Sequence, residues 1–104
     1  MTEARTLTVE DAGPLTTVQD AGRPGWAHLG VSPAGALDRP AADLANRLVG
    51  NAGHAAVLET TLGGVRFRVS APVTLAVAGA EAPVSVDGQP VAFAAAFAAP
   101  AGAT

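Results

Sequence analysis

The stretch TTVQDAGRPGWAHLGVSPAGALDRPAADLANRLVGN, residues 16–51, carries the strongest structural signals of this 104-residue chain. Its middle part, residues 20–40, is dense in the two amino acids with the most unusual backbone preferences. These are Gly22, Gly25, Gly30, Gly35, Pro24, Pro33 and Pro40. Such a density predicts an ordered loop and disfavours both helix and strand across this segment.

A short helix is predicted directly after this loop. Four apolar residues share one face at helical spacing: Ala41, Leu44, Ala45 and Leu48. Asp38 stands where an N-cap belongs, Pro40 is tolerated in a first helical turn, and Gly50 can end the helix.

Strands are predicted on both sides of the loop and helix, where β-branched or alternating residues occur. Their ranges are 6–9, 15–19, 56–60, 65–70, 73–78, 84–86 and 91–93. Asp87-Gly88 between the last two is a strong signal for a two-residue hairpin turn. The pattern is mainly β with one short α-helix, which favours a barrel or a sandwich over a wound α/β sheet.

Composition excludes several classes of function. The chain has an apolar fraction of 49%, enough for a single core, and a formal net charge of -3. Its basic residues are all arginines and are dispersed, which argues against a nucleic-acid surface. Without lysine there is no Schiff base, no Walker-type phosphate lysine and no site for covalent biotin. Without cysteine there is no disulfide and no thiolate ligand.

The two ends of the chain suggest its location and extent. The start is acidic and unlike a secretory signal, and no apolar run of about 18 residues occurs that could span a membrane. A cytoplasmic protein without membrane contact is therefore expected. Residues 91–104, VAFAAAFAAPAGAT, are uncharged and alanine-rich. They are expected to be exposed unless further sequence or a partner protein covers them, so residues 1–104 are interpreted as a truncated amino-terminal part of one domain.

Residues 16–51 resemble the signature of the carboxyltransferase/allophanate hydrolase subunit 2 family, which also contains 5-oxoprolinase subunits. The matching positions are Gln19-Asp20, Gly22-Arg23, Gly25, Gly30-Val31, residues 35–38, Ala45-Asn46 and residues 48–51. Looser agreement continues through Leu58-Glu59, Gly63-Gly64, residues 78–80 and Asp87-Gly88. Two departures are Ala34, where many members carry serine, and the length, because members are much longer chains.

The resemblance implies a cyclophilin-like β-barrel, here partial, and membership of an enzyme complex with partner subunits. Three roles occur in the family. One is a subunit of ATP-dependent 5-oxoprolinase, which converts 5-oxoproline to glutamate; this small-molecule lactam hydrolysis is the function that we expect here. The alternatives are a regulatory protein that antagonises the inhibitor of a sensor kinase, and a subunit of a biotin-dependent carboxyltransferase that acts on urea or a similar amide. ATP is expected to be bound by the complex rather than by this chain alone.

Two carboxylates are candidates for catalysis. Asp20 and Arg23 are three residues apart on a glycine-bounded turn, where they could serve a pocket together or form an ion pair that only holds the loop. Glu59 follows Val57-Leu58 in a predicted strand, and apolar neighbours suit a carboxylate for general acid–base work. The alternative for Glu59 is an ordinary side chain facing solvent.

Five residues are candidates for substrate binding. Arg23 could bind a carboxylate or phosphate through two parallel hydrogen bonds. Asp38 is most simply a helix N-cap, although the helix terminus behind it could attract an anion. Asn46 could contact substrate or make a buried hydrogen bond to the preceding loop. Gln19 and Gly35 are candidates because they belong to the family pattern.

No metal site is predicted. His28 and His54 are the only histidines, and two histidines without a third ligand at a recognisable spacing are weak grounds for a metal.

Overall fold

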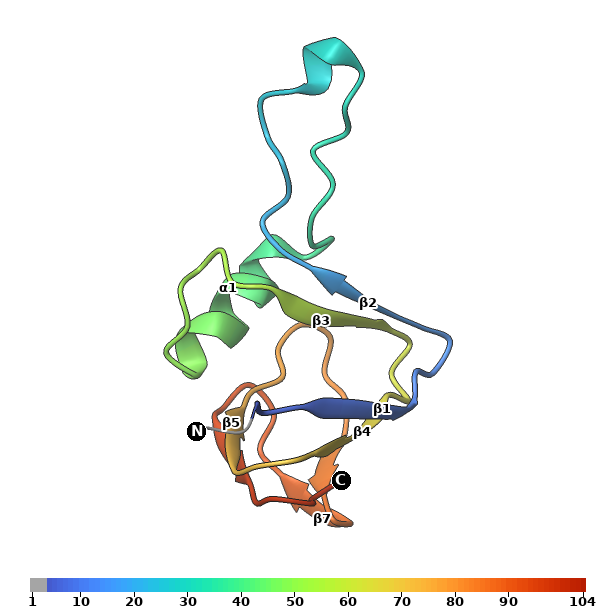
Figure 1. Ribbon diagram of the computed structural model, residues 1–104, viewed down its shortest axis with the longest axis vertical. Helices are drawn as coiled ribbons and strands as arrows, with labels where there is room; N and C mark the ends of the chain where they lie inside the picture. Colours follow the sequence, from blue (N-terminus) through green and yellow to red (C-terminus); the bar gives the residue numbers. More distant parts are fainter. Residues whose placement is uncertain (1–3) are drawn as a thin grey trace.

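The computed structural model describes residues 4–104 as a small body of paired strands with one helix beside it and one long projection (Figure 1). The elements in chain order are β1 (Leu7–Asp11), β2 (Leu15–Gln19), the 3-10 helix η1 (Ala27–Leu29), α1 (Arg39–Leu48), β3 (Val57–Thr61), β4 (Arg66–Val69), β5 (Val73–Leu75), β6 (Val84–Val86), β7 (Gln89–Val91) and β8 (Phe97–Ala99). No helix among the described residues is long and apolar enough to cross a membrane.

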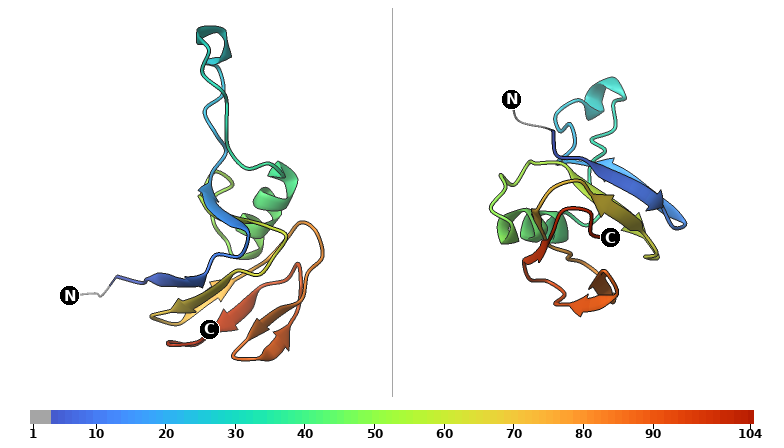
Figure 2. Two further views of the ribbon diagram at one scale, coloured as in Figure 1. Left: turned by 90° about the vertical axis from the view of Figure 1, so that its right-hand side faces the viewer. Right: turned by 60° about the horizontal axis from the view of Figure 1, so that its bottom comes forward.

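The strands form four antiparallel pairs: β1 with β4, β2 with β3, β5 with β8, and β6 with β7. The pairs lie around one another without closing into a continuous cylinder, as the two further views make clear (Figure 2). The expected fold is therefore confirmed: mainly β, a partial β-barrel of the cyclophilin-like kind, and one short α-helix.

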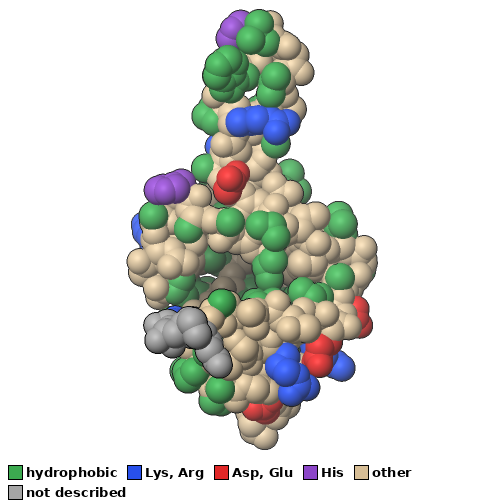
Figure 3. Space-filling model, in the orientation of Figure 1, with side chains coloured by type: hydrophobic (Ala, Val, Ile, Leu, Met, Phe, Trp, Pro, Cys, Tyr) green, Lys and Arg blue, Asp and Glu red, His purple; other side chains and the backbone are tan. Residues whose placement is uncertain are grey.

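Residues 20–36 form a long arm that stands away from the body (Figures 1 and 2). The loop expected here is present, and its tip contains η1, which the sequence did not indicate. The arm explains why the Cα radius of gyration is 14.8 Å, whereas a compact chain of this length would have about 13 Å. Hydrophobic side chains gather on the arm (Figure 3), where Trp26 is 55% exposed and Leu29 is 65% exposed.

The helix begins and ends as its sequence predicts. Asp38 is the N-cap, and its Oδ1 accepts a hydrogen bond from the Ala41 N–H at 3.1 Å. At the other end Gly50 has a φ of 78°. The Gly50 N–H donates to Arg47 O at 3.1 Å and the Asn51 N–H donates to Asn46 O at 2.8 Å. These two bonds form a Schellman motif, which uses glycine because its left-handed conformation costs no Cβ clash.

The hairpin predicted at Asp87-Gly88 is also confirmed. Val86 pairs with Gln89, so the turn has two residues, and Asp87 and Gly88 have φ angles of 49° and 79°. Two consecutive positive φ angles define a type I′ turn, whose twist matches that of the flanking strands. The returning strand is Gln89–Val91, two residues earlier than the expected 91–93.

The alanine-rich end of the chain is covered in part: Ala99 and Ala103 are buried, whereas Ala92, Ala94, Ala96 and Ala98 are exposed, so the expected exposure is found at alternate residues only. Residues Phe97–Ala99 form β8, which pairs with β5, and Ala99 and Ala103 are buried against Val69. These three residues form the centre of the core, with Phe67, Val73, Leu75 and Val86 packed against it. Small side chains suit this position because they allow the last segment to approach β4 closely.

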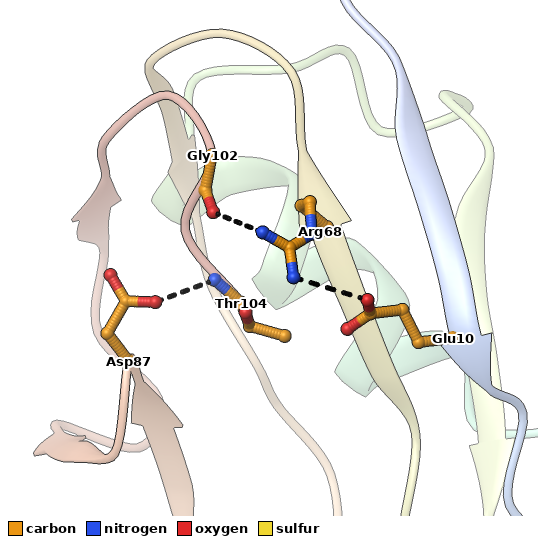
Figure 4. Close-up of polar contacts among 5 residues, drawn as sticks. All are labelled: Glu10, Arg68, Asp87, Gly102 and Thr104. Atoms are coloured by element: carbon orange, nitrogen blue, oxygen red, sulfur yellow. Dashed lines mark hydrogen bonds and ion pairs between the residues drawn. The ribbon is translucent and has the colours of Figure 1, made fainter.

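Polar contacts fasten this last segment to the body (Figure 4). The Thr104 N–H donates to Asp87 Oδ1 at 3.0 Å, and the Asp87 N–H donates to Thr104 O at 2.8 Å. Arg68 Nη1 donates to Gly102 O at 3.2 Å and Arg68 Nη2 lies 3.4 Å from Glu10 Oε2. The Glu10–Arg68 ion pair is exposed to solvent and contributes little on its own.

Candidate functional site

An open hollow of about 320 Å³ lies where the arm joins the body. It is lined by Val18, Gln19, Asp20, Gly22, Arg23, Ala34, Gly35 and Ala56. Four of the residues expected to form a site therefore come together here, namely Gln19, Asp20, Arg23 and Gly35. Gln19 and Asp20 lie at the end of β2, Arg23 lies on the outgoing limb of the arm, and Gly35 lies on the returning limb.

Arg23 is held by the opposite limb of the arm. Its backbone N–H donates to Pro33 O at 2.6 Å and its Nε donates to Ser32 O at 2.9 Å. Of the two alternatives for Asp20 and Arg23, the ion pair is not formed; within residues 4–104 the ion pair observed is Glu10–Arg68. The reason is geometric, because the two limbs run side by side and place backbone carbonyls next to the guanidinium.

Asp20 organises the start of the arm. Its Oδ1 accepts from the Gly22 N–H at 2.8 Å, and its backbone carbonyl accepts from the Ala36 N–H at 2.9 Å. The first bond is an Asx turn that bends the outgoing limb, and the second ties the returning limb to it. Asp20 Oδ2 makes no hydrogen bond within the described residues, and Asp20 lines both this hollow and a smaller one of about 160 Å³.

Several backbone N–H groups of the glycine-rich loop donate within the chain, whereas those of Gly25 and Gly35 have no partner among residues 4–104. The donating groups include the N–H groups of Gly22, Ala34, Ala36 and Leu37. At the start of α1, the Ala41 N–H is taken by the Asp38 cap and Pro40 has no N–H. Asp38 therefore acts as the cap that the sequence predicts, and the anion site considered at this helix terminus stays a prediction.

Glu59 lies outside the lining of the hollow. It is half-buried in β3, opposite Thr17 on β2, and its Oε2 accepts from the Leu37 N–H at 2.7 Å. Leu37 itself is 91% exposed. Glu59 thus holds the point where the arm returns to the body, immediately before the helix cap.

Asn46 also lies outside the hollow and is only 2% exposed. Its Nδ2 donates to Ala55 O at 2.9 Å and lies 3.5 Å from Gly53 O. The hydrogen bond was expected to reach the loop before the helix; it instead reaches the segment after it. Asn46 therefore joins α1 to the approach to β3.

Arg39 is a site residue that sequence reasoning missed. Its Nη2 donates to Ala34 O at 3.3 Å, and it lines a second hollow of about 160 Å³ together with Asp20 and Asp43. The sequence signal for Arg39 was its position: it is the first residue of a helix that directly follows a glycine-rich loop. A second guanidinium thus lies at the base of the arm.

The described residues contain no group of three histidine, cysteine or acidic side chains placed to hold a metal ion. The residues that line the larger hollow include no serine, threonine, cysteine, histidine or lysine. The polar side chains of this lining are one guanidinium, one carboxylate and one amide, from Arg23, Asp20 and Gln19.

Comparison with known proteins identifies the group to which this arrangement is similar. The carboxyltransferase domain, subdomain A and B, matches residues 29–104. The chain is 49% identical over 78 residues to a 5-oxoprolinase subunit of Escherichia coli (strain K12), covering 73% of this chain and 25% of that protein. It is 38% identical over 84 residues to urea amidolyase of Lachancea kluyveri, covering 80% of this chain and 5% of that protein.

Solved structures agree with this similarity. A crystal structure of TTHA0988 superposes with a TM-score of 0.87 at 36% sequence identity, over 93% of this chain and 20% of that chain. A second crystal form of the same protein gives a TM-score of 0.83 at 34% identity. The chain thus spans a quarter or less of the length of the two curated relatives described above.

Proposed function

Because this chain belongs to the family of the carboxyltransferase domain, subdomain A and B, we propose that it contributes to an ATP-dependent complex that hydrolyses an amide or lactam. The proposed substrate is 5-oxoproline and the proposed product is glutamate. Water adds to the lactam carbonyl, the C–N bond of the ring breaks, and the nitrogen leaves as an amine. As a user of ATP, the complex is proposed to act in the cytoplasm.

The observation that carries this proposal is the gathering of Gln19, Asp20 and Arg23 at one hollow, on a chain 49% identical to a 5-oxoprolinase subunit over 78 residues. A lactam with a carboxylate presents a negative group, an N–H donor and a carbonyl acceptor. The hollow offers a guanidinium, a carboxylate oxygen and a side-chain amide, which are complementary to those groups.

The role proposed for this chain is to bind and orient the substrate. The lining of its hollow contains no hydroxyl, thiol, imidazole or lysine side chain, and the N–H groups of Gly22, Ala34, Ala36 and Leu37 are occupied within the chain. ATP is therefore proposed to be held by a partner subunit, which would supply the energy for opening the ring. Arg23 would fix the substrate and Asp20 would accept its N–H.

The similarity to urea amidolyases supports a second candidate. The identities are 38% to the Lachancea kluyveri enzyme and 36% to that of Saccharomyces cerevisiae (strain ATCC 204508 / S288c). On this alternative the chain would belong to a carboxyltransferase that places a carboxyl group on urea or a similar amide. Having no lysine, it would receive the carboxyl group from biotin attached to another chain.

The experiment that decides combines this chain with candidate partner subunits and follows glutamate release from 5-oxoproline, with and without ATP. The Escherichia coli relative in place of this chain is the positive control, and the partners alone are the blank. ATP-dependent glutamate release above the blank is expected. If the positive control works and this chain does not, 5-oxoproline hydrolysis is ruled out for it. Carboxylation of urea with a biotin carrier would then be measured.

A further inference from the structure

Asp87-Gly88 is the one Asp-Gly dipeptide of the chain, and both residues are exposed on the turn between β6 and β7. Glycine has no Cβ, so its backbone nitrogen is unhindered and can attack the carboxyl group of the aspartate before it. Every other aspartate is followed by a residue with a side chain, which hinders this attack; these are Asp11, Asp20, Asp38 and Asp43. Asp87 is therefore the aspartate whose covalent structure is most open to change.

The attack rearranges the backbone without any cofactor. The Gly88 nitrogen forms a bond to Asp87 Cγ, and its proton leaves with the carboxyl hydroxyl as water, which gives a five-membered imide. Water then adds back and breaks the bond between the Asp87 carbonyl carbon and the Gly88 nitrogen, so that the chain continues through Cγ. Water that adds at Cγ instead restores aspartate. The rearranged residue is isoaspartate, which has the mass of aspartate and one more backbone carbon.

The closed turn keeps the two reacting atoms apart. Asp87 and Gly88 have φ angles of 49° and 79°, as a type I′ turn requires. In such a turn the first central residue has a ψ of about +30°, the mirror image of the value in a type I turn. This angle places the Gly88 nitrogen nearly opposite Cβ across the Cα–C bond of Asp87, whereas ring closure needs that nitrogen beside Cγ. The reaction therefore requires the turn to open.

Thr104 holds the carboxylate of Asp87 in place (Figure 4). The Thr104 N–H donates to Asp87 Oδ1 at 3.0 Å, and the Thr104 carbonyl accepts from the Asp87 N–H at 2.8 Å. Asp87 is exposed, and hydrogen bonds at an exposed turn open locally far more often than the whole chain unfolds. Opening of this contact frees the side chain, and opening of the turn brings the Gly88 nitrogen within reach of Cγ.

We propose that Asp87 is a site of spontaneous isomerisation to isoaspartate and that its contact with Thr104 sets the rate. The proposal is independent of the hydrolase function, because it needs neither substrate nor partner. The extra backbone carbon does not fit a two-residue turn in which Val86 pairs with Gln89. Val86 also packs against the core. Isomerisation therefore prevents the hairpin from closing in its native register and lowers the stability of the chain.

The test is to incubate the folded chain, and the same chain in urea, and to digest samples with trypsin over time. Trypsin cuts after arginine, and Arg68 is the last arginine, so residues 69–104 form one peptide in which Asp87 is the only aspartate. The other four aspartates lie in the peptide of residues 6–47, because each arginine inside that stretch precedes proline. Isoaspartate appears as a new chromatographic peak of unchanged mass, which a protease specific for aspartate no longer cleaves at residue 87.

The new peak is expected from residues 69–104 and not from residues 6–47. In the folded chain it should grow at least about tenfold more slowly than in urea, because the reaction waits for local opening. Equal rates in the two conditions would overturn the protection by the turn. Absence of the peak in urea, or an equal peak from residues 6–47, would overturn the assignment to Asp87.

Two substitutions at Thr104 test what sets the rate. Thr104→Pro removes the N–H that donates to Asp87 Oδ1, and the folded variant is expected to isomerise several times faster than the parent. Thr104→Ala keeps this N–H and is the matched control, which should react at the rate of the parent. In urea all three chains should react equally. A Thr104→Pro chain that is folded by thermal unfolding and reacts no faster than Thr104→Ala would overturn the role of the contact.

Two further measurements do not depend on how the Thr104 variants fold. Asp87→Glu moves the carboxyl group one carbon further from the backbone, so the five-membered ring cannot form and the new peak should disappear, in urea as well. A peak that persists would place the reaction elsewhere. The isomerised parent chain, separated by chromatography, should unfold at a lower temperature than the unmodified chain. Equal unfolding temperatures would overturn the predicted loss of the hairpin.

Discussion

Gly22 and Gly35 lie backbone against backbone where the two limbs of the arm leave the body. A Cβ added to Gly35 would lie 2.8 Å from Gly22 N, and one added to Gly22 would lie 2.7 Å from Ala34 O and closer still to Pro33 O. Both residues have positive φ angles, 82° at Gly22 and 89° at Gly35. The hollow between β2 and the arm depends on this contact, because the same residues line it.

Gly35→Ala is expected to destabilise the chain more than Gly25→Ala. Both glycines have positive φ, so alanine at either position incurs about 1–2 kcal/mol of backbone strain. Only Gly35 has backbone atoms in the space of the new Cβ; Gly25 has nothing within 4 Å. Gly35→Ala should therefore lose roughly 1–3 kcal/mol more, measured by urea unfolding. Equal losses would contradict the close packing of the two limbs.

Asn46→Ala is expected to lower the free energy of unfolding by about 1–3 kcal/mol, because it removes the buried Asn46 amide and leaves the half-buried Ala55 carbonyl without its donor. The matched control is Asn51→Ala at the exposed residue beyond the helix, which should change stability by less than about 0.5 kcal/mol. Chemical denaturation of the two variants measures the difference. A loss at Asn51 as large as that at Asn46 would argue against the buried hydrogen bond.

Glu59 is expected to act by holding the arm rather than by reacting. Glu59→Ala removes the acceptor of the Leu37 N–H, so amide hydrogen exchange at Leu37 should become faster. Glu59→Gln keeps an acceptor oxygen and should retain the protection. In an active complex, Glu59→Gln should keep its turnover if the role is positional. A Gln variant that retains Leu37 protection but abolishes turnover would instead identify Glu59 as catalytic.

Burial rather than side-chain size is expected to set the loss of stability when a residue is replaced by alanine. Trp26 is 55% exposed on the arm, so Trp26→Ala should change the free energy of unfolding by less than about 0.5 kcal/mol. Val69 is 2% exposed at the centre of the core, and Val69→Ala should cost about 1.5–3 kcal/mol. Thermal unfolding compares them. Trp26 is the only tryptophan, so solvent-exposed, red-shifted emission from the parent chain checks its surroundings independently.

Local signals in the sequence were enough to place the turns and caps. Asp87-Gly88 forms the expected two-residue turn because residues at both positions must adopt positive φ, which Asp and Gly tolerate. Asp38 caps α1, and Gly50 ends it, for equally local reasons. Each of these features depends on hydrogen bonds between residues at most five apart, so the sequence alone contains the information.

Contacts between residues that are distant in sequence could not be predicted. The alanines of β8 have weak strand propensity, and they form a strand only because Val73 of β5 offers a partner to Ala99. The spacing of three residues favours a pair between Arg23 and Asp20, but the returning limb instead places Ser32 O and Pro33 O against Arg23.

The sequence by itself determined the class of the fold, the helix with its caps, the hairpin turn and the family to which the chain belongs. The tertiary structure alone decided that residues 20–36 project as an arm, that Glu59 and Asn46 support the scaffold beside the hollow, and that Arg23 faces it together with Asp20. The physical reason is that a turn or cap is stabilised by its own neighbours. A hollow depends on where separate segments meet, and here these are the end of β2, the two limbs of the arm and Ala56.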